Sequence, residues 1–293
     1  MPSTPPPPRP PLPLVSIITP SLNQGRFIED TIRSVVAQDY PRIEHIVRDG
    51  GSTDGTVEIL ERYRRAGRLS YTSGRDGGQA GAINQGFAHA KGDIVAWLNS
   101  DDAYVGTDAV TTIVRAFEAH PEIDFVYGDF VEIDEHNTVY RVLLRPPFSR
   151  ERLLRVNYIS QPTTFFRRRV VEKLWLDPSL RYALDLDYWL RASGAGFRFM
   201  HIRKIVAVER LHDSAKCIAE APQMQAEARA VREKHGHRFD LRHRLGRTAD
   251  RVLLGAYGLL GLFPRIQMPL AVSLRRPPVL KGWLYQLRLL RSA

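Results

Sequence analysis

Short β-rich apolar runs alternate with segments of helical apolar spacing over the first 127 residues, and this alternation constrains the fold more than any other feature. The runs predict strands, and the segments between them predict helices. The predicted strands cover residues 15–19, 43–47, 69–72, 94–98 and 125–127, and the predicted helices cover 27–36, 57–63, 80–90 and 109–119. Such alternation is typical of an α/β fold, in which a mostly parallel sheet carries helices on both faces. The later pattern is less regular and predicts a hairpin over 130–142, a strand over 163–166 and a helix after Arg169.

Polar and glycine-rich residues follow each of the first four predicted strands, at 20–23, 49–55, 74–79 and 99–102. Ligands of open α/β sheets bind outside the carboxyl ends of the strands, so we expect these four loops to converge on one crevice. The sequence has neither the Gly-x-Gly-x-x-Gly turn of dinucleotide binding nor a phosphate-binding P-loop motif. The absence of both motifs argues against a dehydrogenase and against a P-loop enzyme.

Carboxylates stand at two of these strand ends, as Asp49 and as the adjacent pair Asp101 and Asp102. Neighbouring carboxylates repel each other unless a cation or solvent relieves them, and hard oxygen ligands suit Mg²⁺ or Mn²⁺ bound with substrate phosphates. The pair could equally cap the helix predicted near residue 109, so both interpretations stay open. The Asp-Gly-Gly sequence at Asp49 suits a turn, but its glycines also allow close backbone approach to a ligand, and we favour binding.

Three segments of the chain, residues 15–23, 49–56 and 97–102, resemble the motifs of the family 2 glycosyltransferases of GT-A fold. They occur in the family's order at the ends of predicted strands, with Asp76 and Asn84 between the second and the third. The resemblance covers residue 15 to about 216. It implies a GT-A type, Rossmann-like, mostly parallel sheet with helices on both faces.

The resemblance also implies a reaction, an inverting sugar transfer from a nucleotide-diphosphate sugar assisted by Mg²⁺ or Mn²⁺. By position in the motifs, Asp101 and Asp102 would hold the metal and the diphosphate. Many relatives have an acid where this chain has Asn99, so the direct metal ligand stays open between the two. The other donor-binding residues implied are Thr19, Pro20 and Asn23 near the nucleoside, Asp49 on the base or ribose, and Asp76 and Asn84.

A transferase also needs a base, because an acceptor hydroxyl is a poor nucleophile until its proton is removed. Asp185 matches the family position that supplies this base. Relatives often carry Glu just before it, whereas this chain has Leu184, which leaves Asp187 as a competitor. In a helix Asp185 and Asp187 point about 200° apart and cannot share one task. We predict Asp185 as the base and Asp187 as a structural residue paired with Arg191.

His212 matches a downstream segment that contacts the metal or the leaving diphosphate in relatives, and it is predicted as a metal ligand. A neutral imidazole can complete a metal shell, and Lys216 could neutralise phosphate. An ordinary structural histidine remains the alternative. Gln161 and the arginines at 167–169 would either line the acceptor side or be solvated, and for the arginines we favour the structural interpretation.

The net charge of +10 is concentrated at the end of the chain. Residues 241–293 contain nine arginines and one lysine against one aspartate, which gives +9 and leaves the rest nearly neutral. Few aromatic residues and no known module accompany this charge, so we expect no nucleic-acid binding. Basic residues mixed with apolar ones in 241–260 predict an amphipathic helix and peripheral contact with an anionic membrane. The longest uncharged stretch there, 252–264, is too short for a membrane-spanning helix.

These observations predict three parts of the chain. Residues 1–13 would form a disordered proline-rich tail, 14–217 a transferase domain with a donor half (14–105) and an acceptor half (106–217), and 218–293 a basic helical extension. The extension includes a helix from Pro222 to Lys234 that ends at Gly236. The lack of a signal peptide and the single cysteine, Cys217, indicate the cytoplasm, with peripheral contact to the inner face of the cell membrane.

The expected function is therefore transfer of a sugar to a hydroxyl of a glycan or lipid-linked acceptor, in bacterial cell-surface polysaccharide assembly. The alternative is a catalytically inactive protein that binds sugar nucleotides, in which Leu184 marks a lost base.

Overall fold

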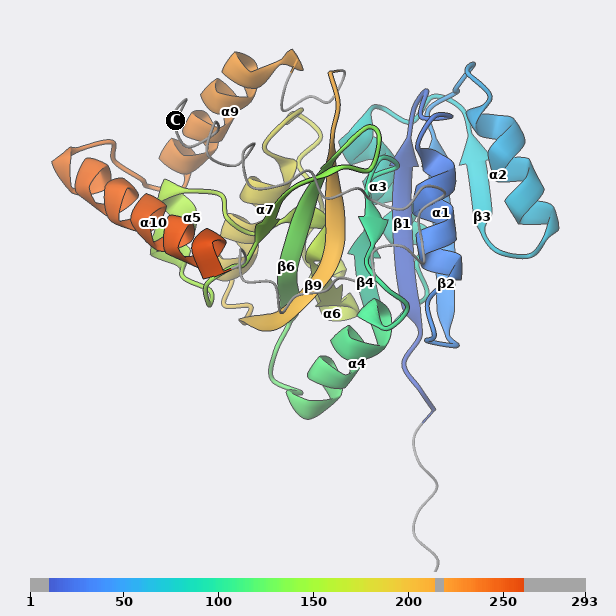
Figure 1. Cartoon of the computed structure of the whole chain (residues 1–293), viewed down its shortest axis with the longest axis horizontal. Coiled ribbons are helices and arrows are strands. Elements are labelled where there is room, and N and C mark those ends of the chain that lie inside the picture. Colours follow the sequence, from blue (N-terminus) through green and yellow to red (C-terminus); the bar gives the residue numbers. More distant parts are fainter. Residues whose placement is uncertain (1–10, 214–218, 261–293) are drawn as a thin grey trace, which may run out of the picture.

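The computed structural model describes residues 11–213 and 219–260 (Figure 1). Most of the predicted tail, Lys216, Cys217 and the predicted extension beyond residue 260 lie outside the described residues.

Nine strands of the described chain form one mixed sheet. Its order is β3-β2-β1-β4-β8-β6-β9-β5, with β7 paired to β6. The first four strands of this order run parallel, as do β6 and β9, while β8, β5 and β7 pair antiparallel to their neighbours. The strands are β1 (Val15–Ser21), β2 (Ile43–Asp49), β3 (Ser70–Ser73), β4 (Ile94–Trp97), β5 (Ala103–Tyr104), β6 (Phe125–Asp134), β7 (Val139–Leu143), β8 (Phe165–Arg167) and β9 (Phe199–Leu211).

Helices cover both faces of the sheet. In Figure 1, α2 and β3 lie at one end of the sheet and α5, α9 and α10 at the other. The helices are α1 (Ile28–Val36), α2 (Thr56–Arg65), α3 (Gln79–His89), α4 (Ala109–Ala119), α5 (Arg150–Arg155), η1 (Gln161–Thr163), α6 (Arg168–Val171), α7 (Leu184–Gly194), α9 (Ala221–Lys234) and α10 (Leu241–Leu260).

The alternation of side chains along each strand divides the core into two layers. On β4, Val95 and Trp97 join the layer that packs against α3 and α7, while Ile94 and Ala96 join the layer against α1 and α4. Successive side chains of a strand point to opposite faces, so a strand covered by helices on both sides is apolar throughout. This confirms the predicted α/β fold with helices on both faces.

The 13-residue strand β9 is not predicted by the sequence. Charged residues interrupt its apolar pattern, but the tertiary structure pairs them. His201 lies 2.8 Å from Asp129 on β6, and the Lys204 ammonium lies 2.7 Å from Asp108. The alternation of apolar and polar residues that indicates a strand does not appear when the polar side chains pair with distant residues instead of being solvated.

Helices α9 and α10 confirm both helices predicted after residue 218, and each packs on the α/β body. Helix α10 is fastened through Asp250, whose carboxylate accepts hydrogen bonds from Arg152 (3.1 Å) and Arg155 (2.6 Å) at α5.

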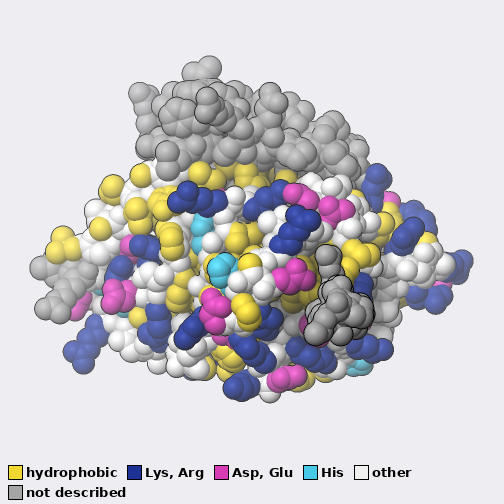
Figure 2. Space-filling view, turned by 90° about the horizontal axis from the view of Figure 1, so that it is seen from below, with side chains coloured by type: hydrophobic (Ala, Val, Ile, Leu, Met, Phe, Trp, Pro, Cys, Tyr) yellow, Lys and Arg dark blue, Asp and Glu magenta, His cyan; other side chains and the backbone are white. Residues whose placement is uncertain are grey.

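None of the helices in residues 11–213 and 219–260 combines the length and apolar character needed to cross a bilayer. At the amino-terminal edge of the sheet, basic and acidic side chains are interspersed (Figure 2).

Candidate functional site

A cleft of about 690 Å³ opens at the carboxyl ends of β1, β3 and β4. Its walls come from segments far apart in the sequence. They include the loops after these three strands, the start of α7, the end of β9 and one residue of α9, Met224. Of the candidate site residues named from the sequence, Pro20, Asp76, Asp101, Asp102, Gln161, Asp185 and His212 line this cleft.

Asp101 and Asp102 form a turn directly after β4 and before the short strand β5. Helix α4 begins only at Ala109, with Asp108 in the N-cap position. The interpretation of the acidic pair as a helix cap is therefore wrong. The turn places the two carboxylates at a strand end that faces the cleft.

Asp102 is almost completely buried, with 5% of its surface exposed. Desolvation and the neighbouring carboxylates of Asp101 and Glu209 raise its pKa well above the ordinary range, against the backbone N–H and the charge of Arg210, which lower it. The Arg210 N–H donates to Asp102 Oδ1 at 3.1 Å. A cation at this point would relieve the crowding of negative charge.

Asp101 is more exposed and contacts His212, whose Nε2 lies 3.2 Å from Asp101 Oδ2. The His212 ring is buried against Phe27, with ring centroids 4.8 Å apart. Oxygen and imidazole donors thus meet at one wall of the cleft, a donor set that suits a divalent ion. Among residues 11–213 and 219–260, no group of three or more His, Cys, Asp and Glu side chains is arranged to hold a metal.

Asp185 lies in the first turn of α7 and lines the cleft. Asn157 Nδ2 donates to its carboxylate at 2.9 Å. Desolvation raises the Asp185 pKa, while the hydrogen bond from Asn157 lowers it. Helix α7 is held under β4 by stacking of Trp189 on Trp97, with ring centroids 5.3 Å apart, and this packing brings Asp185 to the same cleft as the acidic pair.

Asp187 lies on the other side of α7, fully buried, with its carboxylate 2.6 Å from Arg191 Nε. Its predicted structural role is confirmed. The three consecutive arginines also have structural partners. Arg167 and Arg168 donate to backbone carbonyls, and Arg169 pairs with Asp124 at 2.5 Å.

Four predicted donor residues do not line the cleft. Thr19 is buried with its hydroxyl 2.9 Å from His45, and Asp49 is 1% exposed and accepts hydrogen bonds from Ser52 and Ser73. The Asn23 side chain accepts from the Thr53 N–H. The loop after β2 thus braces the loop after β1 instead of lining the cleft. A direct contact of these residues with a nucleotide stays a prediction.

Asn84 is the fourth of these residues, and its amide forms two hydrogen bonds of 2.9 Å with the backbone of Leu176. These bonds fasten α3 to the chain segment before α7. The predicted contact of Asn84 with the donor stays a prediction.

Sequence reasoning missed three charged residues of the cleft, Arg181 before α7 and Glu209 and Arg210 at the end of β9. Desolvation raises the pKa of Glu209 to about 7, and the Ser160 hydroxyl donates to its carboxylate at 2.6 Å. Arg210 is 3% exposed and contacts Asp30 at 3.2 Å and the Asp101 carbonyl at 2.9 Å. The available sequence signal for Glu209 and Arg210 was that two charged residues directly follow an apolar run. The burial of their side chains depends on partners far away in the sequence, so this signal could not predict it.

A model of glycosyl transferase family 2 matches residues 16–175, a segment that ends before α7. An uncharacterized glycosyltransferase of Mycobacterium tuberculosis is 36% identical over 184 residues, covering 62% of this chain and 69% of that protein. TuaG of Bacillus subtilis, whose name places it provisionally in teichuronic acid biosynthesis, is 30% identical over 203 residues, covering 68% of this chain and 79% of that protein.

Two solved structures share the fold. TarS of S. aureus in complex with UDP-GlcNAc has a TM-score of 0.59 at 19% identity, covering 76% of this chain and 70% of that one. The mannosyltransferase PcManGT of Pyrobaculum calidifontis, in complex with GDP-Man and Mn²⁺, has a TM-score of 0.56 at 20% identity, covering 85% and 83%. At this identity the likeness establishes the α/β GT-A architecture.

Proposed function

Since the chain belongs to glycosyl transferase family 2 and is a nucleotide-sugar-dependent transferase, we propose that it moves a sugar, with inversion, to a hydroxyl of a glycan or lipid-linked acceptor. One observation carries this proposal. The acidic pair after β4, His212 after β9 and Asp185 at the start of α7 all line one cleft at the carboxyl edge of the sheet. The donor complexes of TarS and PcManGT support a nucleotide sugar as the ligand of this cleft.

The donor diphosphate would lie beside Asp101, Asp102 and His212. These three side chains are not arranged to hold a metal by themselves, but their donor atoms would suit a divalent ion bound together with substrate phosphates, and Mn²⁺ accompanies GDP-Man in PcManGT. When bound, Mg²⁺ or Mn²⁺ supplies charge stabilisation for the departing diphosphate. The protein's part is to hold the two carboxylates at the strand end, within reach of the donor.

Asp185 would act on the acceptor side as the general base. Its carboxylate accepts the proton of the incoming hydroxyl as the oxygen of that hydroxyl bonds to the anomeric carbon and the bond to the diphosphate breaks. Attack opposite the leaving group inverts the anomeric centre. The hydrogen bond from Asn157 orients the carboxylate and leaves it open to the cleft.

A loss of the family's activity, which Leu184 in the position before the base suggests, would make the chain an inactive sugar-nucleotide binder. Such a binder would bind nucleotide without releasing it from any donor. Turnover that depends on Asp185 would exclude it.

The donor site can be tested by thermal unfolding with UDP, GDP, UDP-GlcNAc and GDP-mannose, each with and without Mn²⁺. We expect a rise in melting temperature that requires both a nucleotide and Mn²⁺, since only the folded state binds the pair. Asp102→Ala should remove this rise. Asp108→Ala, at the N-cap position of α4 and outside the cleft, is the control and should keep it. Equal shifts in Asp102→Ala and the wild type would refute the proposed site.

Peripheral membrane contact through residues 241–293 is also proposed, on the basis of their charge of +9. Each basic residue near an anionic lipid surface contributes about 1 kcal/mol, an interaction that salt screens. Protein bound to anionic vesicles should therefore be released at high salt. Complete retention at high salt would contradict the electrostatic part of this proposal.

A further inference from the structure

Helix α9 lies outside the segment that matches the family and outside the predicted transferase domain, yet it contacts the cleft. Met224 of α9 lines the cleft beside Arg181, Tyr182 and Leu184. Glu220, the residue before α9, accepts hydrogen bonds from the side chains of Arg181 (2.8 Å) and Tyr182. The acceptor side of the cleft is therefore built partly from the extension.

Glu227, in the middle of α9, accepts hydrogen bonds from three successive backbone N–H groups. The distances to its carboxylate oxygens are 3.0 Å from Arg181, 2.7 Å from Tyr182 and 2.7 Å from Ala183. These residues immediately precede α7, and Asp185 follows two residues later. One side chain thus binds the backbone that leads into the helix carrying the base.

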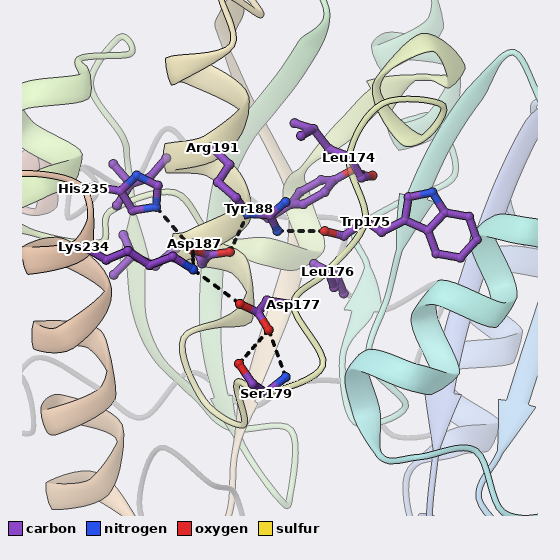
Figure 3. Close-up of polar contacts among 12 residues, drawn as sticks. Leu174, Trp175, Leu176, Asp177, Ser179, Asp187, Tyr188, Arg191, Lys234 and His235 are labelled. Carbon is purple, nitrogen blue, oxygen red and sulfur yellow. Dashed lines mark hydrogen bonds and ion pairs between the residues drawn. The ribbon is translucent and has the colours of Figure 1, made fainter.

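A second set of contacts fixes the other end of α9 to α7 (Figure 3). Around the buried Asp187 carboxylate, Figure 3 shows Arg191 of α7 together with Lys234 and His235 at the end of α9. His235 Nε2 lies 3.2 Å and Lys234 Nζ 3.8 Å from Asp187 Oδ1. Lys234 also contacts Asp177, 3.4 Å away in the segment before α7. Anchored at both ends, α9 can hold the start of α7 in place.

The position of α9 also affects Asp185 directly. Arg232 of α9 lies close enough that its positive charge opposes the rise of the Asp185 pKa.

We propose that α9 is part of the catalytic unit and that Glu227 is a positioning residue, which holds residues 181–183 and thereby the base Asp185. This inference rests on the proposed function of Asp185. Three charge-assisted hydrogen bonds to one carboxylate restrict the backbone at the entry to α7. A displacement of about 1 Å of a catalytic group can cost about 100-fold in rate, so this restriction matters for transfer.

The test compares Glu227→Ala, Glu227→Gln and the wild type. Backbone N–H exchange with deuterium at residues 181–184 should become several-fold faster in Glu227→Ala. Nucleotide release from UDP-GlcNAc or GDP-mannose should fall about 10- to 100-fold in kcat, with the donor KM within about threefold. Glu227→Gln keeps the Oε1 acceptor that all three N–H groups reach, so it should recover most of the activity.

Glu233→Ala is the matched control, because Glu233 lies on the same helix and pairs with the exposed Arg229 at 3.0 Å. It should leave both the exchange and kcat unchanged. Unchanged exchange in Glu227→Ala, or faster exchange with kcat as in the wild type, would overturn the positioning role. A wild type that binds nucleotide but releases none from either donor would instead count against the proposed function, while the exchange measurement still reports on the contact itself.

Discussion

Replacing Asp185 by Asn should lower kcat by about 100- to 10,000-fold while leaving nucleotide binding intact. The range is that of a positioned general base, and Asn keeps the size of the side chain without its ability to take a proton. The Asp185 side chain lines the cleft, and in our proposal it acts on the acceptor while Asp101 and Asp102, in the turn after β4, hold the donor. Nucleotide release from donor sugars measures kcat, and thermal shift with Mn²⁺ measures donor binding.

The pH dependence of kcat tests whether Asp185 is the titrating group, since Asp102 and Glu209 in the same cleft also have raised pKa values. Its pKa is raised by desolvation, so the base is charged only above that raised value, and kcat should fall as pH decreases through a range above the ordinary carboxyl pKa of about 4. Asn157→Ala removes a hydrogen bond that lowers this pKa and should move the acidic limb to higher pH. A limb that does not move, or an Asp185→Asn enzyme with wild-type kcat, would refute the assignment.

Replacing Arg210 by Met should lower the free energy of unfolding by about 3–5 kcal/mol, the usual cost of removing one partner of a buried ion pair. The Arg210 side chain is 1% exposed, and it contacts the buried Asp30 and lies 5.1 Å from the Phe27 ring. In the variant, the buried positive charge of Arg210 no longer stands among the acidic side chains of the cleft. The guanidinium charge that lowers the Asp102 pKa is also lost, whereas the backbone N–H of residue 210 that donates to Asp102 remains, so the Asp102 pKa should rise further and Mn²⁺-dependent nucleotide binding should weaken.

Urea denaturation followed by tryptophan fluorescence measures this loss. Arg62→Met is the control, since the Arg62 side chain is 61% exposed and its 2.8 Å pair with Glu29 should contribute less than about 1 kcal/mol. A loss for Arg210→Met as small as that of the control would show that the burial of this guanidinium does not matter for stability.

Local patterns were sufficient to predict much of this molecule. Strands β1 to β4 and helices α1 to α4 follow from apolar periodicity, because a strand covered on both faces and a helix covered on one leave distinct signals in the sequence. The acidic pair at the end of β4 was found for the same reason, since the end of a parallel strand is where a ligand binds. Asp185 could be assigned only with the family resemblance, because it lies in a helix and the rule for the ends of parallel strands does not apply there.

Only the tertiary structure decided which side chains share the cleft and which support it. Asp49 and Asn84 stand in recognisable motifs, yet their hydrogen bonds go to neighbouring loops, whereas Glu209 and Arg210 stand in no motif and line the cleft. The contribution of α9 through Glu227 was equally hidden. Burial, pKa and hydrogen-bond partners depend on residues tens to more than a hundred positions away, and local periodicity carries no information about such contacts.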